Sequence, residues 1–218
     1  MFQFICDSCL AAKQIGPDRA AEFAYGAGQI DPLKALKLDL IYEADEKDYI
    51  SFLCGQGFNA STLYLITEKY IICFEVANST ARDLNYPSFA LKAPRPKHHV
   101  SGTFKRIVTN VGLPMSTYIA NVTAPKGIHI SVTPSVLSFT ALGEKQSFVL
   151  TIHGKMKRSI RSASLVWDDG QYQVRSPIVI FDDRAISKGV SLYRINYIYT
   201  VIFGLLFCII IIIIIIIK

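Results

Sequence analysis

A period-two alternation of apolar and polar residues, beginning at about residue 83, is the feature that most constrains the fold of this chain. Such alternation is typical of strands that bury one face. The apolar members of the clearest stretches are Tyr118, Ala120 and Val122; Ile128, Ile130 and Val132; Phe148, Leu150 and Ile152; and Ala163, Leu165 and Trp167. Gly, Pro and Asp turn signals separate these stretches. About seven short strands at this spacing predict an antiparallel β-sandwich of about 100 residues, with Trp167 in its core.

Upstream of the sandwich, the sequence predicts less regular structure. Asp31 is a suitable helix cap and Pro32 suits a first helical position, so a helix is expected to begin there. A second short helix is predicted over about 61–69, and a Pro- and Lys-rich linker over 93–99. The expected divisions are an unassigned leader (1–16), a mixed segment (17–82), the sandwich (83–182) and an apolar tail (195–217).

The tail contains no charged residue between positions 195 and 217, and nine consecutive isoleucines precede Lys218. About 20 apolar residues suffice for a helix that crosses a bilayer, so the tail is a candidate transmembrane helix. Three tyrosines around its start (Tyr193, Tyr197 and Tyr199) and the basic residues upstream fit a membrane interface. A second interpretation stays open, because an isoleucine homopolymer also results from translation of a low-complexity repeat beyond the true end of a gene.

Charge and cysteine usage exclude several classes of function. The formal net charge of +6 is spread along the chain, and its densest basic stretches contain no interleaved aromatic residues, so no nucleic-acid partner is expected. Cys6 and Cys9 form a lone Cys-x-x-Cys without a second ligand pair, so neither a metal nor another cofactor is expected. The apolar run at residues 2–6 is too short for a secretory signal peptide.

Five segments of the chain carry distinctive motifs, in the order Phe23–Pro32 with Lys34-Ala35, Asp48–Cys54, Asp83–Phe89, Phe104–Gly112 and Trp167–Ile178. Together they resemble the C-terminal portion of plant subtilisin-like (cucumisin-type) serine proteases over about residues 18–181. The residues that carry the motifs include Gly26, Gly28, Tyr86, Pro87, Arg106, Asn110, Gly112, Trp167, Gly170, Arg175 and Pro177.

The resemblance implies that residues 17–82 close a subtilisin-like catalytic domain and lead out of it. It also implies that residues 83–182 form a fibronectin type III-like sandwich. Gln29 and Asp31 replace the usual His and Asn of the first motif, and Leu38-Asp39 stands where the family usually has Pro-Gly. These departures fall in an expected loop.

Catalytic residues are not expected in this chain. The family's catalytic Asp, His, Asn and Ser lie upstream of the first motif, and residues 1–22 contain no Gly-Thr-Ser-Met nucleophile motif. Four histidines are present: His98 and His99 in the linker, His129 on an outward strand face and His153 at a strand end. The chain is therefore predicted not to be an enzyme, although its parent family consists of serine-type endopeptidases.

The resemblance further implies a disulfide between Cys54 and Cys73, with two reduced buried thiols as the alternative if the chain does not reach an oxidising compartment. Sequons for N-glycosylation occur at Asn59, Asn78 and Asn121, of which Asn121 is expected to face solvent. Arg106 and Arg175 are expected to cover apolar surface with their stems while their charges stay in water. Two alternatives stay open for these charges: they face a catalytic domain, or they form salt bridges within the sandwich.

The first functional hypothesis is a non-catalytic portion of an extracellular (apoplastic) protease, whose sandwich supports or docks on a catalytic domain. Segment 17–40 would pack inside that domain, and alone it would expose an apolar patch that invites self-association (Phe23, Tyr25, Leu33 and Leu36). One alternative is a membrane-tethered β-sandwich interaction module anchored by residues 195–217. Another is a fragment that complements a separately made catalytic chain.

Overall fold

The computed structural model describes residues 2–4, 22–27, 39–73, 80–94, 99–156 and 159–182. The helix predicted at Asp31, the candidate membrane segment 195–217, Gly28 and Asn78 lie outside the described residues. Within the described ranges, no helix is both long enough and apolar enough to cross a membrane. The membrane-tethered alternative therefore rests on sequence alone.

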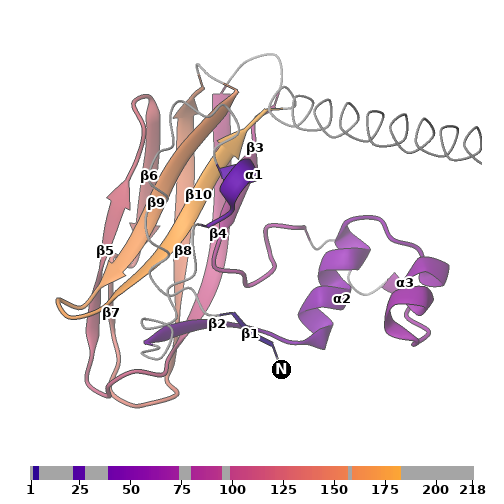
Figure 1. Ribbon diagram of the computed structural model, residues 1–218, viewed down its shortest axis with the longest axis horizontal. Coiled ribbons are helices and arrows are strands. Elements are labelled where there is room, and N and C mark those ends of the chain that lie inside the picture. The colour runs from indigo at the N-terminus through magenta and orange to yellow at the C-terminus, as the bar shows by residue number, and fades with distance from the viewer. Residues whose placement is uncertain are drawn as a thin grey trace, which may run out of the picture.

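Two five-stranded sheets form the body of the structure (Figure 1). The first has the order β1-β2-β4-β8-β6, and its strands are β1 (Phe2–Phe4), β2 (Leu40–Ala44), β4 (His99–Asn110), β8 (Lys145–Lys155) and β6 (Ile128–Thr133). The second has the order β3-β10-β9-β5-β7, and its strands are β3 (Phe89–Lys92), β10 (Gln173–Phe181), β9 (Ile160–Asp168), β5 (Thr117–Thr123) and β7 (Val136–Ser138). The predicted sandwich is confirmed, with one correction to its antiparallel character: β3 runs parallel to β10.

The core lies between the two sheets, where the alternating apolar side chains meet. Phe104 on β4 packs edge-on against Phe89 on β3, with ring centroids 5.4 Å apart. Phe148 on β8 packs in the same manner against Trp167 on β9 at 5.1 Å. Trp167 is fully buried, which confirms its predicted place in the core.

The described helices are α1 (Glu22–Tyr25), α2 (Glu46–Gly55) and α3 (Ala60–Thr67). Helix α3 confirms the helix predicted over 61–69, and it ends at Glu68 in the left-handed conformation. Helix α2 was not predicted, although its start carries a recognisable signal. Asp45 accepts hydrogen bonds from the backbone of Lys47 and Asp48, and the Asp48 side chain accepts one from the Asp45 backbone, which makes a reciprocal capping box.

Strand β2 comes from the mixed segment yet belongs to the sandwich. It pairs with β4 through Leu40 opposite Asn110 and Ile41 opposite Thr109. Tyr42 is fully buried, and its hydroxyl lies 3.2 Å from the Ser176 hydroxyl on β10 of the other sheet. The segment upstream of residue 83 therefore shares both a sheet and a core with the segment downstream of it.

Glu43 fastens β2 to the next two strands of its sheet, β4 and β8. Its Oε2 lies 2.6 Å from Lys145 Nζ on β8 and accepts a hydrogen bond from Thr109 Oγ1 on β4 at 2.9 Å. The hydrogen bond from Lys145, aided by that from Thr109 and opposed by partial burial, lowers the pKa of Glu43 below its ordinary value of 4.5.

We expect this carboxylate to make the stability of the sheet depend on pH. Because the pKa is lower in the folded state, the stabilisation is present above pH 4.5 and is lost as the pH falls through the folded pKa. Urea unfolding should show that Glu43→Gln costs about 1 kcal/mol at pH 6 and much less at pH 3. Glu68→Gln is the control on an exposed carboxylate, and an equal loss at both pH values for Glu43→Gln would contradict the prediction.

Candidate functional site

Helix α1 lies against the sandwich, beside the sheet that contains β3 and β10 (Figure 1). The ring of Phe23 packs edge-on against Phe181 at the end of β10, with centroids 5.1 Å apart. The Ser162 hydroxyl on β9 donates a hydrogen bond of 2.6 Å to Glu22 Oε2, across 140 residues of sequence. Gly26 ends the helix at a positive φ, and its backbone N–H bonds to the Glu22 carbonyl. The contacts of Phe23 with Phe181 and of Glu22 with Ser162 join the first motif segment to the sandwich.

Of the apolar patch predicted for this segment, the structure describes the exposure of Phe23. Phe23 remains 52% exposed despite its contact with Phe181. Leu33 and Leu36 of the same predicted patch lie outside the described residues. Phe23 and Phe181 thus form one continuous apolar edge, part of which faces solvent.

Arg106 holds the entry segment, which we define as residues 80–88, against the core. Its Nε donates to the Tyr86 carbonyl at 2.9 Å, and one terminal nitrogen donates to the carbonyls of Arg82 at 2.6 Å and Lys105 at 2.8 Å. The guanidinium carbon lies 5.0 Å from the ring centroid of Phe89 and 5.5 Å from that of Phe104.

The sequence-based expectation that the Arg106 charge stays in water was wrong. The side chain is only 3% exposed, and burial lowers its pKa to about 10. It therefore remains a cation at neutral pH, with backbone carbonyls in place of water. It neither faces a partner nor pairs with a carboxylate through a described contact, because its hydrogen bonds go to main-chain oxygens.

Asn85 joins the entry segment to both β2 and β4. Its Nδ2 donates to the carbonyls of Glu43 and Ile107 at 2.9 Å each, and its Oδ1 accepts from the Ile107 backbone at 2.9 Å. Sequence reasoning did not single out this side chain. Its neighbours in the same motif contribute differently, since Pro87 is buried and Tyr86 binds Arg106 through its carbonyl.

Asn110 and Gly112 shape the turn that follows β4. Asn110 is fully buried; its Nδ2 donates to the Leu113 carbonyl at 3.0 Å, and its Oδ1 accepts from the Gly112 backbone at 3.1 Å. A Cβ at Gly112 would lie 2.6 Å from Asp39 Oδ1. The glycine therefore permits a close approach between this turn and the residue that leads into β2.

The remaining motif residues lie in the closing strands. Gly170 has a positive φ in the turn between β9 and β10, where Asp168 and Asp169 accept backbone hydrogen bonds as their turn position predicts. Pro177 is buried on β10 opposite Ser164, and Arg175 is half-buried on the same strand.

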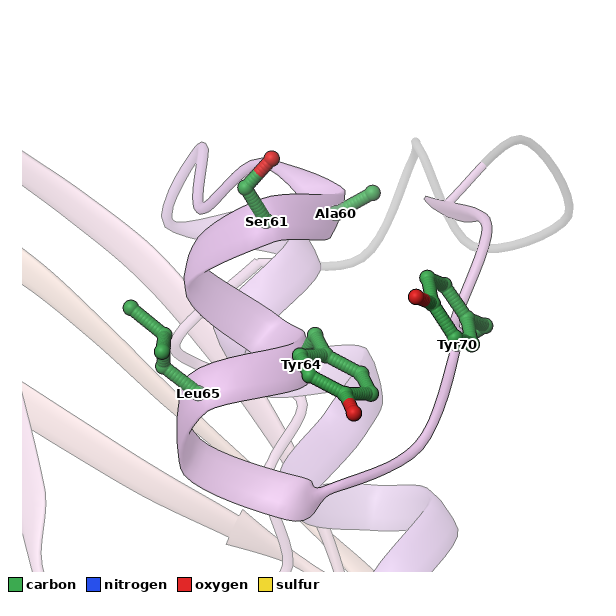
Figure 2. A pocket seen from close by; sticks show the side chains of 5 residues that line it. All are labelled: Ala60, Ser61, Tyr64, Leu65 and Tyr70. Atoms are coloured by element: carbon green, nitrogen blue, oxygen red, sulfur yellow. The ribbon is translucent and has the colours of Figure 1, made fainter.

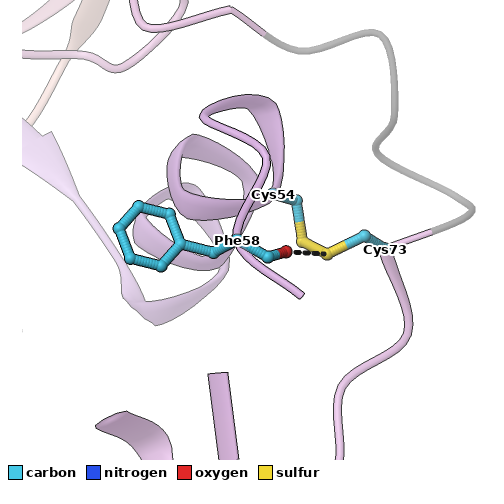
Figure 3. Close-up of a disulfide and its surroundings, with 3 residues drawn as sticks. All are labelled: Cys54, Phe58 and Cys73. Carbon is cyan, nitrogen blue, oxygen red and sulfur yellow. Dashed lines mark hydrogen bonds between the residues drawn. A yellow bond between two sulfur atoms is a disulfide. The ribbon is translucent and has the colours of Figure 1, made fainter. Parts of the chain in front are cut away.

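The predicted disulfide between Cys54 on α2 and Cys73 is confirmed (Figure 3). The Cys73 sulfur also lies 3.8 Å from the Phe58 carbonyl oxygen. The bridge closes a loop that contains α3 and fixes it to α2.

Loss of this bridge should destabilise the α2–α3 unit selectively. In the double variant Cys54→Ser/Cys73→Ser, the unfolded loop gains entropy worth about 3 kcal/mol. We expect amide exchange in residues 60–73 to accelerate by about 100-fold, while β8 and β9 stay protected. Uniform acceleration across both regions would show that the bridge stabilises the whole molecule instead.

Two of the predicted glycosylation sites are described, and both side chains are exposed. Asn121 lies on β5 between the partly buried Ala120 and Val122, which confirms its outward orientation. Asn59 is the N-cap of α3. Across the described ranges, no group of three or more His, Cys, Asp or Glu residues is arranged to hold a metal ion.

Comparison with known proteins shows which families the chain resembles. The model of the fibronectin type-III domain family matches residues 83–180. Subtilisin-like protease SBT4.10 of Arabidopsis thaliana is 43% identical over 175 residues, which is 78% of this chain and 25% of the relative. This chain resembles the C-terminal portion of plant subtilisin-like proteases. Subtilisin-like proteases SBT4.13 and SBT4.12 of the same plant are 43% and 45% identical, over 74% of the chain and 23% of each relative. The chain thus spans about a quarter of the length of these relatives.

Proposed function

We propose that this chain acts as a non-catalytic supporting module, whose sandwich docks on a subtilisin-like catalytic domain. The contact of α1 with β9 and β10 carries the proposal. By family resemblance, α1 belongs to the segment that closes the catalytic domain. Its Phe23 and Glu22 contact Phe181 and Ser162 of the sandwich. The edge of the sandwich at Phe181 is therefore the side on which the rest of that domain would lie.

The arrangement of the histidines supports a non-catalytic role. His99, His129 and His153 are exposed on strands of the first sheet. The rings of His129 and His153 lie 4.7 Å apart, and in the described part of the chain none of the three bonds to a serine or a carboxylate. Serine proteolysis needs an imidazole that is held between a hydroxyl and a carboxylate.

An extracellular location fits the same proposal. Disulfides persist in oxidising compartments and are rare in the cytosol. The Cys54–Cys73 bridge, together with relatives that are subtilisin-like proteases, supports passage through the secretory pathway.

The α1 contact is tested in the chain itself by hydrogen exchange. Phe181→Ala removes the aromatic partner of Phe23, a contact worth about 0.5–1.5 kcal/mol. We expect amide exchange in residues 22–27 to accelerate about 2- to 10-fold, with little change in β4 and β8.

Phe58→Ala is the matched control, because it removes another partly exposed aromatic ring away from α1. Unchanged exchange of residues 22–27 in Phe181→Ala would mean that the first motif segment does not dock on this edge.

A further inference from the structure

The surface of α3 and the following segment is unusually apolar for a solvent-facing region. Leu65 is 80% exposed, Tyr70 88% and Ile72 70%, and Tyr64 and Ile66 are also exposed. Tyr64 and Tyr70 pack together with ring centroids 4.6 Å apart. Exposed apolar patches of this kind mark a surface that something else covers.

A shallow hollow of about 360 Å³ lies in this surface, lined by Ala60, Ser61, Tyr64, Leu65 and Tyr70 (Figure 2). Ala60 and Ser61 stand at the start of α3, and the two tyrosine rings face one another below them, whereas Leu65 points to the other side of the helix. Ala60 and Ser61 are also the second and third residues of the Asn59 sequon. One wall of the hollow is therefore built from the sequon itself.

The geometry of Asn59 leaves its amide nitrogen available. Oδ1 accepts from the Thr62 backbone N–H and from Thr62 Oγ1, both at 2.9 Å, and so caps the helix. No described residue bonds to Nδ2, and the side chain is exposed. A substituent on Nδ2 is compatible with the cap, because the cap uses only the oxygen.

We propose that Asn59 carries an N-linked glycan whose first sugars lie in this hollow, over Tyr64 and Tyr70. In the transfer, Asn59 Nδ2 forms a bond to the anomeric carbon of a lipid diphosphate-linked oligosaccharide. The bond from that carbon to the diphosphate oxygen breaks, the lipid diphosphate leaves, and Nδ2 gives up one proton. The inference rests on the secretory route in the proposed function.

The chemistry of the hollow suits a sugar ring. A pyranose presents C–H groups on its faces and hydroxyls at its edge, while tyrosine offers an apolar ring with a polar tip. Tethering through Asn59 holds the sugar beside the hollow at a high effective concentration, so a weak stacking contact suffices. Such a glycan would cover part of the apolar surface that the disulfide-closed α2–α3 unit exposes.

The test uses the full chain, secreted from a glycosylating eukaryotic host behind an added signal sequence. Ser61→Ala abolishes the sequon and leaves the Asn59 cap intact, and Thr123→Ala abolishes the Asn121 sequon as the matched control. Peptide mass spectrometry should find a glycan on the Asn59 peptide of the wild type and none in Ser61→Ala. Fluorescence of an apolar dye should rise at least twofold in Ser61→Ala and stay unchanged in Thr123→Ala.

Nuclear Overhauser contacts between the first sugar and the Tyr64 or Tyr70 ring should be present in the wild type. An unmodified Asn59 in the secreted chain overturns the proposal, as does a glycan without these contacts or without an effect on dye binding. Exchange in residues 22–27 should be the same in Ser61→Ala and wild type, so failure here is distinguishable from failure of the supporting role.

Discussion

Arg106→Ala should lower the free energy of unfolding by about 3–5 kcal/mol. The substitution leaves the carbonyls of Arg82, Tyr86 and Lys105 without their donor, and a buried group without its partner costs about 1–3 kcal/mol. It also removes the stacking over Phe89 and Phe104. Because a domain has only about 5–15 kcal/mol of stability, this loss should be visible as a large shift of the urea midpoint.

Two further variants separate the causes of that effect. Arg106→Lys keeps the charge but cannot reach all three carbonyls in one plane, so we expect it to recover less than half of the loss. Arg161→Ala is the control, since that side chain makes one exposed hydrogen bond to the Lys126 carbonyl and should cost less than about 1 kcal/mol. A cost below 1 kcal/mol for Arg106→Ala would show that the entry segment does not depend on this guanidinium.

Trp167→Ala should have an effect of similar size through a different cause. Trp167 is fully buried between the sheets, and its ring packs against Phe148 at 5.1 Å. Truncation of a buried aromatic side chain leaves a cavity and costs about 3–5 kcal/mol. Chemical denaturation with circular dichroism measures this loss.

The phenylalanine variant tests whether packing or the indole N–H matters. No described residue accepts a hydrogen bond from Trp167 Nε1. Trp167→Phe therefore removes some volume but also an unpaired donor, and we expect it to cost less than half as much as the alanine variant. Ile119→Ala, at an exposed position of the neighbouring β5, should cost under 1 kcal/mol. Equal losses for the Phe and Ala variants would contradict a packing role.

Alternation predicted the strands that have one buried face and failed where that condition does not hold. In β2, Leu40, Ile41, Tyr42 and Ala44 are all buried, so the strand carries no period-two signal. The parallel pairing of β3 with β10 depends on which distant strand lies beside it, and local sequence does not encode that. Strand β4, in contrast, keeps a clear alternation from His99 to Val108.

The burial of Arg106 was readable from that same alternation. Phe104, Arg106 and Val108 share the inward phase of β4, whereas Lys105 and Ile107 point outward. Arginine is usually exposed, and the inward phase of position 106 overrides that general preference here. The tertiary contacts of α1 could not be anticipated in this way, since Glu22 and Ser162 are 140 residues apart and neither lies in a periodic pattern that specifies the other.

The most direct measurement of the proposed role is labelling with a fluorophosphonate probe, which reacts with active serine hydrolases. The chain is mixed with the catalytic domain of an Arabidopsis relative that lacks its own C-terminal portion, and the labelled chains are resolved by mass. We predict that labelling of the catalytic domain increases when this chain is added and that this chain stays unlabelled. Labelling of this chain, or a catalytic domain whose labelling does not respond to it, would contradict a non-catalytic supporting module.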